Sequence, residues 1–497
     1  MPNVFSKLKF SNSFASLSND FYSRVAPTPF VSSPELLHFN QDVAGLIDLD
    51  ATAAVHPDIA AIFSGQNLLE GSDPIAMLYA GHQFGHFVSQ LGDGRAILLG
   101  EVRNAQGEPW EIQLKGSGVT PYSRNADGRA VLRSTIREYL CSEAMHALGI
   151  PTTRALCIVG SRDEVYREQI ERGAMLTRLA PSHVRFGSFE VFYYRQQFDH
   201  LRTLADYVIR YHFPELQAVK NPYQGLLSEI IRRTAHLIAQ WQSVGFSHGV
   251  MNTDNMSILG LTLDYGPYGF MDAYDPGYIC NHSDHEGLYA YNRQPDRGLF
   301  NVSCLAQAML PLLADDVDQA VALARDELEQ YRDHYAQSYA DLMRAKLGLL
   351  ESQSEDQQLV QGLLDLMAAD GVDFTLLFRR LCSFSIRQDA VNAPLCELFS
   401  DLQAFNQWLR RYKVRLLDED SVDALRCQQM KQVNPKYILR NHLAEQVIRA
   451  AEDEQNYDEL ECLFQLLKKP FEDQKAHEKY TVLPPEWAKK LSVSCSS

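Results

Sequence analysis

The chain has 497 residues, and its 63 acidic and 46 basic side chains give a formal net charge of −17. This acidity argues against a general nucleic-acid-binding protein, because neutralising phosphates needs a basic surface. Apolar residues make up 45% of the chain, as in globular proteins. No apolar run approaches the roughly 18 residues of a membrane span, and the first residues lack a secretory pattern, so we expect a cytoplasmic protein.

Four segments differ in composition and pattern along the chain. Residues 1–75 indicate an N-terminal extension of short helices and loops, and residues 76–200 are glycine-rich with strand-like runs. Residues 201–480 are mainly helical, and residues 481–497 form a tail that contains Cys495. Strands followed by helices, joined through a loop-rich stretch, predict an α+β fold with two lobes.

Two strand-like runs in the second segment predict a hairpin. Residues 96–102 are largely apolar, residues 110–115 alternate, and the turn-forming residues 104–108 lie between them. Further strands are expected at residues 155–159 and 174–177.

Two helices are expected from their apolar period. Ile136, Leu140 and Ala144 recur every four residues, which predicts a helix over residues 134–148 before a glycine and a proline. A longer amphipathic run covers residues 226–244.

A glycine-rich turn, a lysine and a glutamate follow one another in the order of a protein-kinase N-lobe. Gly92 and Gly94 precede the first hairpin strand, and glycines let backbone N–H groups approach phosphates. Lys115 ends the second strand and can neutralise phosphate oxygens, and Glu138 of the helix can pair with it. Taken singly, the turn could be an ordinary one and the lysine simply exposed, and the third kinase glycine is missing.

Basic side chains are concentrated in this part of an otherwise acidic chain. They are Arg95, Lys115, Arg124, Arg129, Arg133, Arg137, Arg178 and Arg185. Arginine forks suit bidentate phosphate contacts, and the loop at Asp127 and Gly128 can expose further N–H groups.

Two loops after the longer helix carry oxygen ligands for a divalent cation. Asn255 lies seven residues after His248, and Asp264 begins an Asp-Tyr-Gly sequence. Mg²⁺ and Mn²⁺ prefer such oxygens, and kinases hold metal with equivalent loops. Val250 occupies the position of the kinase base and cannot accept a proton, so Asp254 is the candidate base or substrate-positioning group.

With these motifs the chain resembles the selenoprotein O (YdiU) family of kinase-fold protein adenylyltransferases. The matching stretches are residues 79–85, 90–95, 113–118, 124–138, 248–255, 264–267, 434–437 and 495–497. The resemblance implies a protein-kinase-like two-lobed fold with N-terminal and C-terminal helical extensions. It also implies transfer of AMP from ATP, bound in a flipped orientation, to Ser, Thr or Tyr hydroxyls of proteins, with release of pyrophosphate. Some members use UTP with Mn²⁺, so UMP transfer is a second expected activity.

The resemblance also implies roles for individual residues. Nucleotide contacts are expected from Gly92, Gly94, Arg95, Lys115, Asp127, Gly128, Arg178, Arg185 and Asp264. Lys115 and Glu138 correspond to the ion pair, Asp254 to the proton acceptor, and Asn255 with Asp264 to the ligands of Mg²⁺ or Mn²⁺. The expected partners are ATP and protein substrates, with no nucleic acid and no membrane.

A redox element in the tail is a further implication of the resemblance. Eukaryotic members carry selenocysteine near the C-terminus, where this chain has Cys495, and Cys280 is the matching partner near the active-site loops. The hypothesis is that a Cys280–Cys495 disulfide closes the tail over the site and lowers activity until it is reduced. Two free thiols are the alternative.

Three other functions compete with this interpretation. A non-catalytic pseudokinase scaffold is favoured by Val250 and disfavoured by the presence of both the ion pair and the metal ligands. A true protein kinase would need another base. A zinc hydrolase is suggested by the spacing of His82 and His86, or of His282 and His285, but no helical H-E-x-x-H pattern is present.

Overall fold

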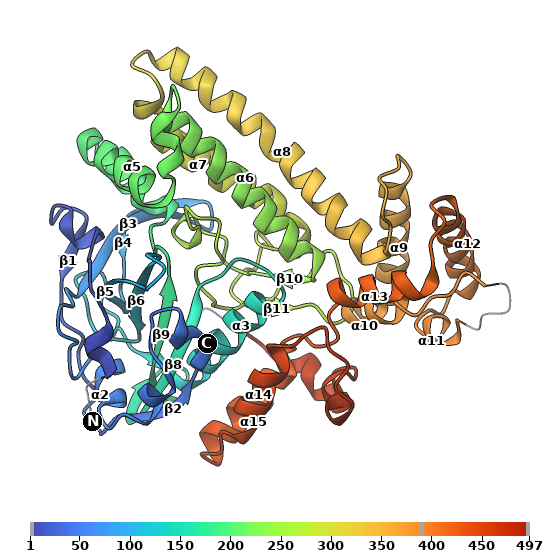
Figure 1. Ribbon diagram of the computed structural model, residues 1–497, viewed down its shortest axis with the longest axis horizontal. Helices are drawn as coiled ribbons and strands as arrows, with labels where there is room; N and C mark the ends of the chain where they lie inside the picture. Colours follow the sequence, from blue (N-terminus) through green and yellow to red (C-terminus); the bar gives the residue numbers. More distant parts are fainter. Residues whose placement is uncertain (1–3, 388–391, 494–497) are drawn as a thin grey trace.

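Strands occupy one side of the molecule and long helices the other (Figure 1). The computed structural model describes residues 4–387 and 392–493. The predicted α+β class is confirmed, with the strands concentrated early in the chain and the helices later. None of the helices in these described ranges is long and apolar enough to cross a membrane.

A nine-stranded antiparallel sheet forms the first lobe. Its main path runs β1-β3-β5-β6-β9-β8-β2, with β4 attached to β3 and β7 to β9. The strands are β1 (Tyr22–Arg24), β2 (Glu35–Phe39), β3 (Ile75–Gln83), β4 (His86–Gly92), β5 (Ala96–Arg103), β6 (Pro109–Lys115), β7 (Ala130–Val131), β8 (Arg154–Tyr166) and β9 (Ile170–Ala180).

Two of these strands come from the first 75 residues, where the sequence indicated only short helices and loops. β1 pairs with β3 and β2 pairs with β8, so both extend the sheet. They have three and five residues, which is too short for a clear alternating pattern. The short helices of this region are η1 (Val4–Lys7), η2 (Phe14–Ser16), α1 (Gln41–Gly45), η3 (Ala51–Val55) and α2 (Ile59–Phe63).

The predicted hairpin is confirmed as β5 and β6, with Ala96 opposite Lys115. The runs expected at 155–159 and 174–177 lie within β8 and β9, which pair as a second and longer hairpin.

The first predicted helix is α3 (Leu132–Ala147), which packs against β8 and β9. Its opposite side is covered by α14 (Asn441–Asp453) and α15 (Asp458–Leu467), so most of α3 is buried. The C-terminal helices thus bury the side of α3 that an amphipathic helix would expose to solvent.

The helical lobe begins with α4 (Phe186–Tyr194) and α5 (Phe198–His212), and the second predicted helix is confirmed within α6 (Pro222–Ser243). Beside α6 run α7 (Gln294–Leu313) and α8 (Val317–Leu347) (Figure 1). The remaining helices are η4 (Pro214–Ala218), η5 (Thr253–Asn255), η6 (Tyr291–Arg293), α9 (Asp356–Asp370), α10 (Phe374–Leu381), α11 (Ala393–Cys396), α12 (Leu402–Asp418), α13 (Asp423–Val433), η7 (Lys475–Tyr480) and η8 (Glu486–Lys490).

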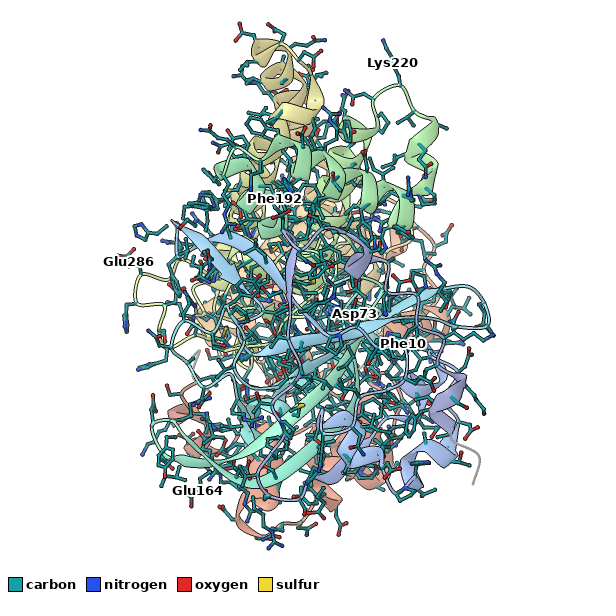
Figure 2. The ribbon with its side chains drawn as sticks, turned by 90° about the vertical axis from the view of Figure 1, so that its left-hand side faces the viewer. Phe10, Asp73, Glu164, Phe192, Lys220 and Glu286 are labelled. Atoms are coloured by element: carbon teal, nitrogen blue, oxygen red, sulfur yellow. The ribbon has the colours of Figure 1, made fainter. Side chains whose placement is uncertain are left out.

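One apolar core joins the sheet to the helical lobe. It contains Met77 of β3, Phe192 of α4 and Leu226 of α6, all fully buried or nearly so. In Figure 2, Phe192 lies between the strands, where Phe10 and Asp73 are labelled, and the helical segments that lead up to Lys220. The loops between α6 and α7 are joined by a second pair of short strands, β10 (Phe246–Ser247) and β11 (Gly269–Phe270).

Candidate active site

Four charged side chains meet where the sheet, α3 and the loop after η5 converge. Lys115, at the end of β6, forms ion pairs with both Glu138 of α3 and Asp264. Arg178 of β9 donates to the same two carboxylates, at 2.9 Å in each case. Two cations therefore face two anions, and each charge has partners that offset its loss of hydration.

The register of the sheet places these groups. Gln113 lies opposite Arg178 in the β6–β9 pair, and its Oε1 accepts a hydrogen bond from Arg178 Nε at 2.8 Å. Lys115 follows two residues later on the same strand, so both cations point to the same side of the sheet. The predicted Lys115–Glu138 pairing is present in this geometry.

The network holds Asp264 as a carboxylate. Burial alone would raise the pKa of Asp264, but Lys115, Arg178 and Arg185 together hold it well below its ordinary value. Burial lowers the pKa of Lys115, against the opposing effect of Asp264 and Glu138. The site therefore offers an ionised oxygen ligand before any cation or nucleotide binds.

Asp254 lies in η5 and is buried, and this burial raises its pKa to about 6. Its Oδ2 accepts a hydrogen bond from Gln83 Nε2 at 3.0 Å. Its Oδ1 is buried and has no hydrogen-bond partner within the described part of the chain. This oxygen can accept a proton without first losing another donor.

The neighbouring Asn255 is oriented by its own loop. Its Nδ2 donates to the carbonyl oxygen of Val250 at 3.0 Å, which leaves Oδ1 as the atom that can face a ligand. Asn255 and Asp264 line the same cleft, so an amide and a carboxylate oxygen are available together. This donor set fits Mg²⁺ or Mn²⁺.

These groups line a cleft with a volume of about 400 Å³, which adjoins a second cavity of about 360 Å³. Both lie within the size range of small-molecule sites. The predicted site residues that line the first cavity are Gly92, Gly94, Arg95, Lys115, Asp127, Gly128, Arg178, Arg185, Asp254, Asn255 and Asp264. Glu138 stands directly behind Lys115. The fold thus brings together residues that are up to 172 positions apart, from Gly92 to Asp264.

The basic side chains of the cleft differ in whether they already have interaction partners. Arg95 and Arg124 line both cavities and have no ion-pair partner among the residues the structure describes. Arg185 is held against the Tyr79 ring, 4.8 Å from its centroid, and Arg185 Nη1 donates to the carbonyl oxygen of Asp254 at 2.8 Å. The cleft therefore combines fixed with available positive charge.

Two members of the predicted basic cluster are directed elsewhere. Arg133 pairs with Glu171, and Arg137 donates to the carbonyl oxygen of Tyr268. Arg167 was not predicted from the sequence as a site residue, yet its guanidinium pairs with Asp127 at the cleft. Nothing local marks this contact, because the two residues are 40 positions apart in the sequence.

Gly128 is required by its conformation and by its packing. Its φ is +67°, and a Cβ there would lie 2.0 Å from the carbonyl oxygen of Gly118. Gly92 is similarly restricted, because a Cβ would lie 2.3 Å from the Tyr122 ring. The loops can therefore approach one another closely at the mouth of the cleft.

Cys280 is buried, and its Sγ donates to the carbonyl oxygen of Pro267 at 2.8 Å. Burial raises the pKa of its thiol to about 12. The backbone N–H of His282 donates to the carbonyl oxygen of Val493 at 2.8 Å, so the described end of the tail passes close by. Cys495 lies outside the described residues.

Comparison with known families shows which family the chain belongs to. Residues 4–468 match the family described as protein adenylyltransferase SelO. The chain belongs to this family. The SelO assignment covers both lobes, and it confirms the resemblance inferred from the motifs and the kinase-like character of the fold.

Curated relatives extend the SelO match over nearly the whole chain. The protein nucleotidyltransferase YdiU of Thiobacillus denitrificans is 55% identical over 490 residues, covering 99% of both chains. Proteins of the same description from Thioalkalivibrio sulfidiphilus and Myxococcus xanthus are 54% and 51% identical, again with 99% of both chains covered.

Proposed function

We propose that this SelO-family protein transfers AMP from ATP to Ser, Thr or Tyr hydroxyls of other proteins, with pyrophosphate as the leaving group. The supporting observation is the cleft in which the Lys115–Glu138–Asp264–Arg178 network lies beside Asp254. It combines positive charge for a triphosphate with a buried carboxylate oxygen that lacks a hydrogen-bond partner in the part of the chain that the structure describes. Displacement at phosphorus mainly requires such positioning and charge neutralisation.

The arginines of the cleft bind the triphosphate in this proposal. Arg95 and Arg124 can turn toward phosphate oxygens without breaking an ion pair within the described chain. Arg178 and Arg185 are buried and already oriented, so they add fixed charge at little cost in conformational freedom.

Asn255 and Asp264 would hold the divalent cation, Mg²⁺ or Mn²⁺. When bound, the cation neutralises charge on the phosphate oxygens and on the departing pyrophosphate. Lys115 and Arg178 keep the Asp264 carboxylate in place, so it needs little rearrangement to act as a ligand.

Asp254 accepts the proton of the attacking hydroxyl. Asp254 lines the cleft, its Oδ1 has no hydrogen-bond partner among the described residues, and Val250 cannot take this role. Gln83 fixes the other oxygen, which aims the carboxylate.

Transfer of the γ-phosphate, as in a kinase, and ATP binding without transfer are the competing functions. The purified protein should be incubated under reducing conditions with a mixture of cytosolic proteins and ATP labelled on either the α- or the γ-phosphate. We expect protein-bound α-label without γ-label. The label should be lost with EDTA and restored by Mg²⁺ or Mn²⁺, and α-labelled UTP with Mn²⁺ tests UMP transfer. Protein-bound γ-label would contradict the proposal, and ATP binding without either label would favour the scaffold.

We also propose that Cys280 and Cys495 form the redox switch implied by the family resemblance. The hydrogen bond between His282 and Val493 supports this, because it brings the tail near Cys280. We expect oxidation to lower the transfer rate several-fold and reductant to restore it in the parent chain. Cys280→Ser and Cys495→Ser should abolish this response, whereas Cys396→Ser in the helical lobe should retain it. A parent rate that is independent of reductant would contradict the switch.

A further inference from the structure

The end of β3 packs directly against the loop that carries Asp254. The backbone N–H of His82 donates to Thr253 Oγ1 at 2.7 Å, and the next residue, Gln83, donates to Asp254 itself. A Cβ on Gly81 would lie 2.8 Å from Asp254 Oδ1 and 3.0 Å from Thr253 Oγ1. Strand and loop are therefore in direct contact, with no room for a side chain between them.

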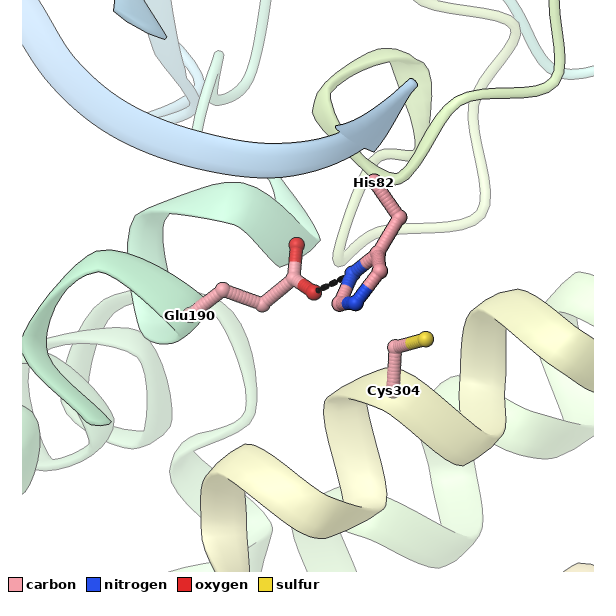
Figure 3. A group of neighbouring side chains, drawn as sticks. All are labelled: His82, Glu190 and Cys304. Atoms are coloured by element: carbon pink, nitrogen blue, oxygen red, sulfur yellow. Dashed lines mark hydrogen bonds and ion pairs between the residues drawn. The ribbon is translucent and has the colours of Figure 1, made fainter. Parts of the chain in front are cut away.

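A buried carboxylate ties this strand to the loop a second time. Glu190 of α4 is fully buried, and its Oε1 accepts a hydrogen bond from His82 Nδ1 at 2.6 Å (Figure 3). Its Oε2 accepts a hydrogen bond from Thr253 Oγ1 at 2.5 Å. The Thr253 hydroxyl thus donates to Glu190 and accepts from the backbone N–H of His82, so two hydrogen bonds fix its position.

Helix α4 is itself a fixed element. Gly187 lies so close to β3 that a Cβ would be 2.1 Å from the carbonyl oxygen of Ala80. The N–H of Phe186 donates to the carbonyl oxygen of Met256, at 2.9 Å, just beyond η5. The helix that carries Glu190 is thereby attached to the strand and to the loop at once.

The ring of His82 is held by its surroundings as well. The rings of Phe87, Tyr194 and Phe300 lie around it, with centroids 5.1 to 6.0 Å away. These rings restrict rotation of the imidazole, so its hydrogen bond to Glu190 is maintained. That hydrogen bond in turn keeps the Glu190 carboxylate directed toward Thr253.

Cys304 of α7 lies near this pair, and its thiol with His82 and Glu190 forms a group that could hold a metal ion (Figure 3). The hydrogen bonds argue against this role. Both Glu190 oxygens already accept a donor, and burial raises the pKa of the Cys304 thiol to about 12, which disfavours the thiolate that a metal requires. The Glu190 carboxylate, which would be the charged ligand, therefore has its hydrogen-bond donors without an ion.

We propose that the hydrogen-bond chain His82–Glu190–Thr253 positions Asp254 for nucleotidyl transfer. The inference rests on the proposed function, because it assigns the chain to the orientation of the proton acceptor in that reaction. None of the three side chains lines the two cavities of the cleft, so they are positioning residues rather than catalytic ones. Thr253 precedes Asp254 directly, so a shift of its side chain is passed on to the carboxylate through one peptide unit.

The test is steady-state kinetics of α-label transfer by the full-length protein. Thr253→Val keeps the shape but leaves Glu190 Oε2 and the backbone N–H of His82 without a partner, and Glu190→Gln replaces an acceptor with a donor. We expect kcat to fall by about 10- to 100-fold, with KM for ATP within about twofold of the parent, because a displacement near 1 Å costs about this much. Thr253→Ser restores the hydroxyl and should recover most of the rate.

A matched control is Thr234→Val in α6, since Thr234 is a buried threonine whose hydroxyl also donates a hydrogen bond. It should leave kcat unchanged. Gly81→Ala provides a second test from the strand side, because its methyl group would displace both Asp254 and Thr253 Oγ1, and it should also lower kcat.

Three outcomes would overturn the inference. The first is that Thr253→Val and Glu190→Gln both keep the kcat of the parent. The second is that thermal unfolding shows a smaller folded fraction that accounts for the whole loss of kcat. The third is that the purified protein holds one equivalent of zinc and that removing it abolishes transfer. If the parent protein transfers no α-label although it binds ATP, the proposed function itself fails, so the two failures are distinguishable.

Discussion

Replacement of Asp264 with alanine is expected to abolish metal binding and to reduce AMP transfer by at least about 10³-fold. Asp264 is the ionised ligand of the proposed cation site and a partner of both Lys115 and Arg178. Its loss removes the carboxylate that anchors the cation, and the cation supplies several kcal/mol of charge stabilisation in the transition state.

The same change should also lower stability. Without Asp264, the buried cations Lys115 and Arg178 share only Glu138, and breaking a buried ion pair costs up to about 3–5 kcal/mol. Thermal unfolding must therefore accompany the activity assay, together with Mn²⁺ binding measured by electron paramagnetic resonance. Asp264→Asn retains the shape and should lose metal binding with less effect on packing.

Asp272→Asn is a suitable control for Asp264. Asp272 is similarly exposed and paired with Arg440, but it does not line the cleft. It should bind Mn²⁺ and transfer AMP as the parent does. Metal-dependent transfer at the parent rate by folded Asp264→Ala would contradict the assignment of the metal ligand.

Replacement of Asp254 is expected to slow transfer by about 10²- to 10⁴-fold while ATP binding is retained, since this is the usual contribution of general base catalysis. Asp254 lines the cleft and has one carboxylate oxygen without a partner among the described residues, whereas the phosphate-binding charge comes from other residues. Both Asp254→Ala and the isosteric Asp254→Asn should show the loss.

Single-turnover transfer and calorimetric ATP binding separate the two effects for Asp254. A low rate with the parent dissociation constant supports the role in proton transfer. Gln83→Ala removes the hydrogen bond to Oδ2 but keeps the Asp254 carboxylate, and it should cause a smaller loss of rate. Parent rates for both Asp254 variants would place the base elsewhere.

Local patterns in the sequence predicted the hairpin of β5 and β6, helix α3 and the order of Lys115 and Glu138 along them. Alternation and a four-residue period depend only on near neighbours, so they can be read directly from the chain. The motifs were also sufficient to indicate the family, through their resemblance to the motifs of its known members.

Long-range packing decided the rest. β1 and β2 are strands because the edges of a sheet built from later residues stabilise them, although they are short. Arg133 and Arg137 belong to the same basic stretch as Arg178, yet their partners lie outside the cleft. The direction of a long side chain depends on which carboxylates and carbonyls the fold brings near it.

The sequence by itself determined the chemistry of this protein: the cations, carboxylates and glycines that a nucleotide site needs, and the absence of an acid at Val250. Only the tertiary structure decided how Asp254 is held. Glu190 and Thr253 are 63 positions apart and carry no shared motif, and their hydrogen bond forms because α4 packs against β3 and the loop. Such contacts arise from the burial of the whole core, which brings together residues that no local pattern connects.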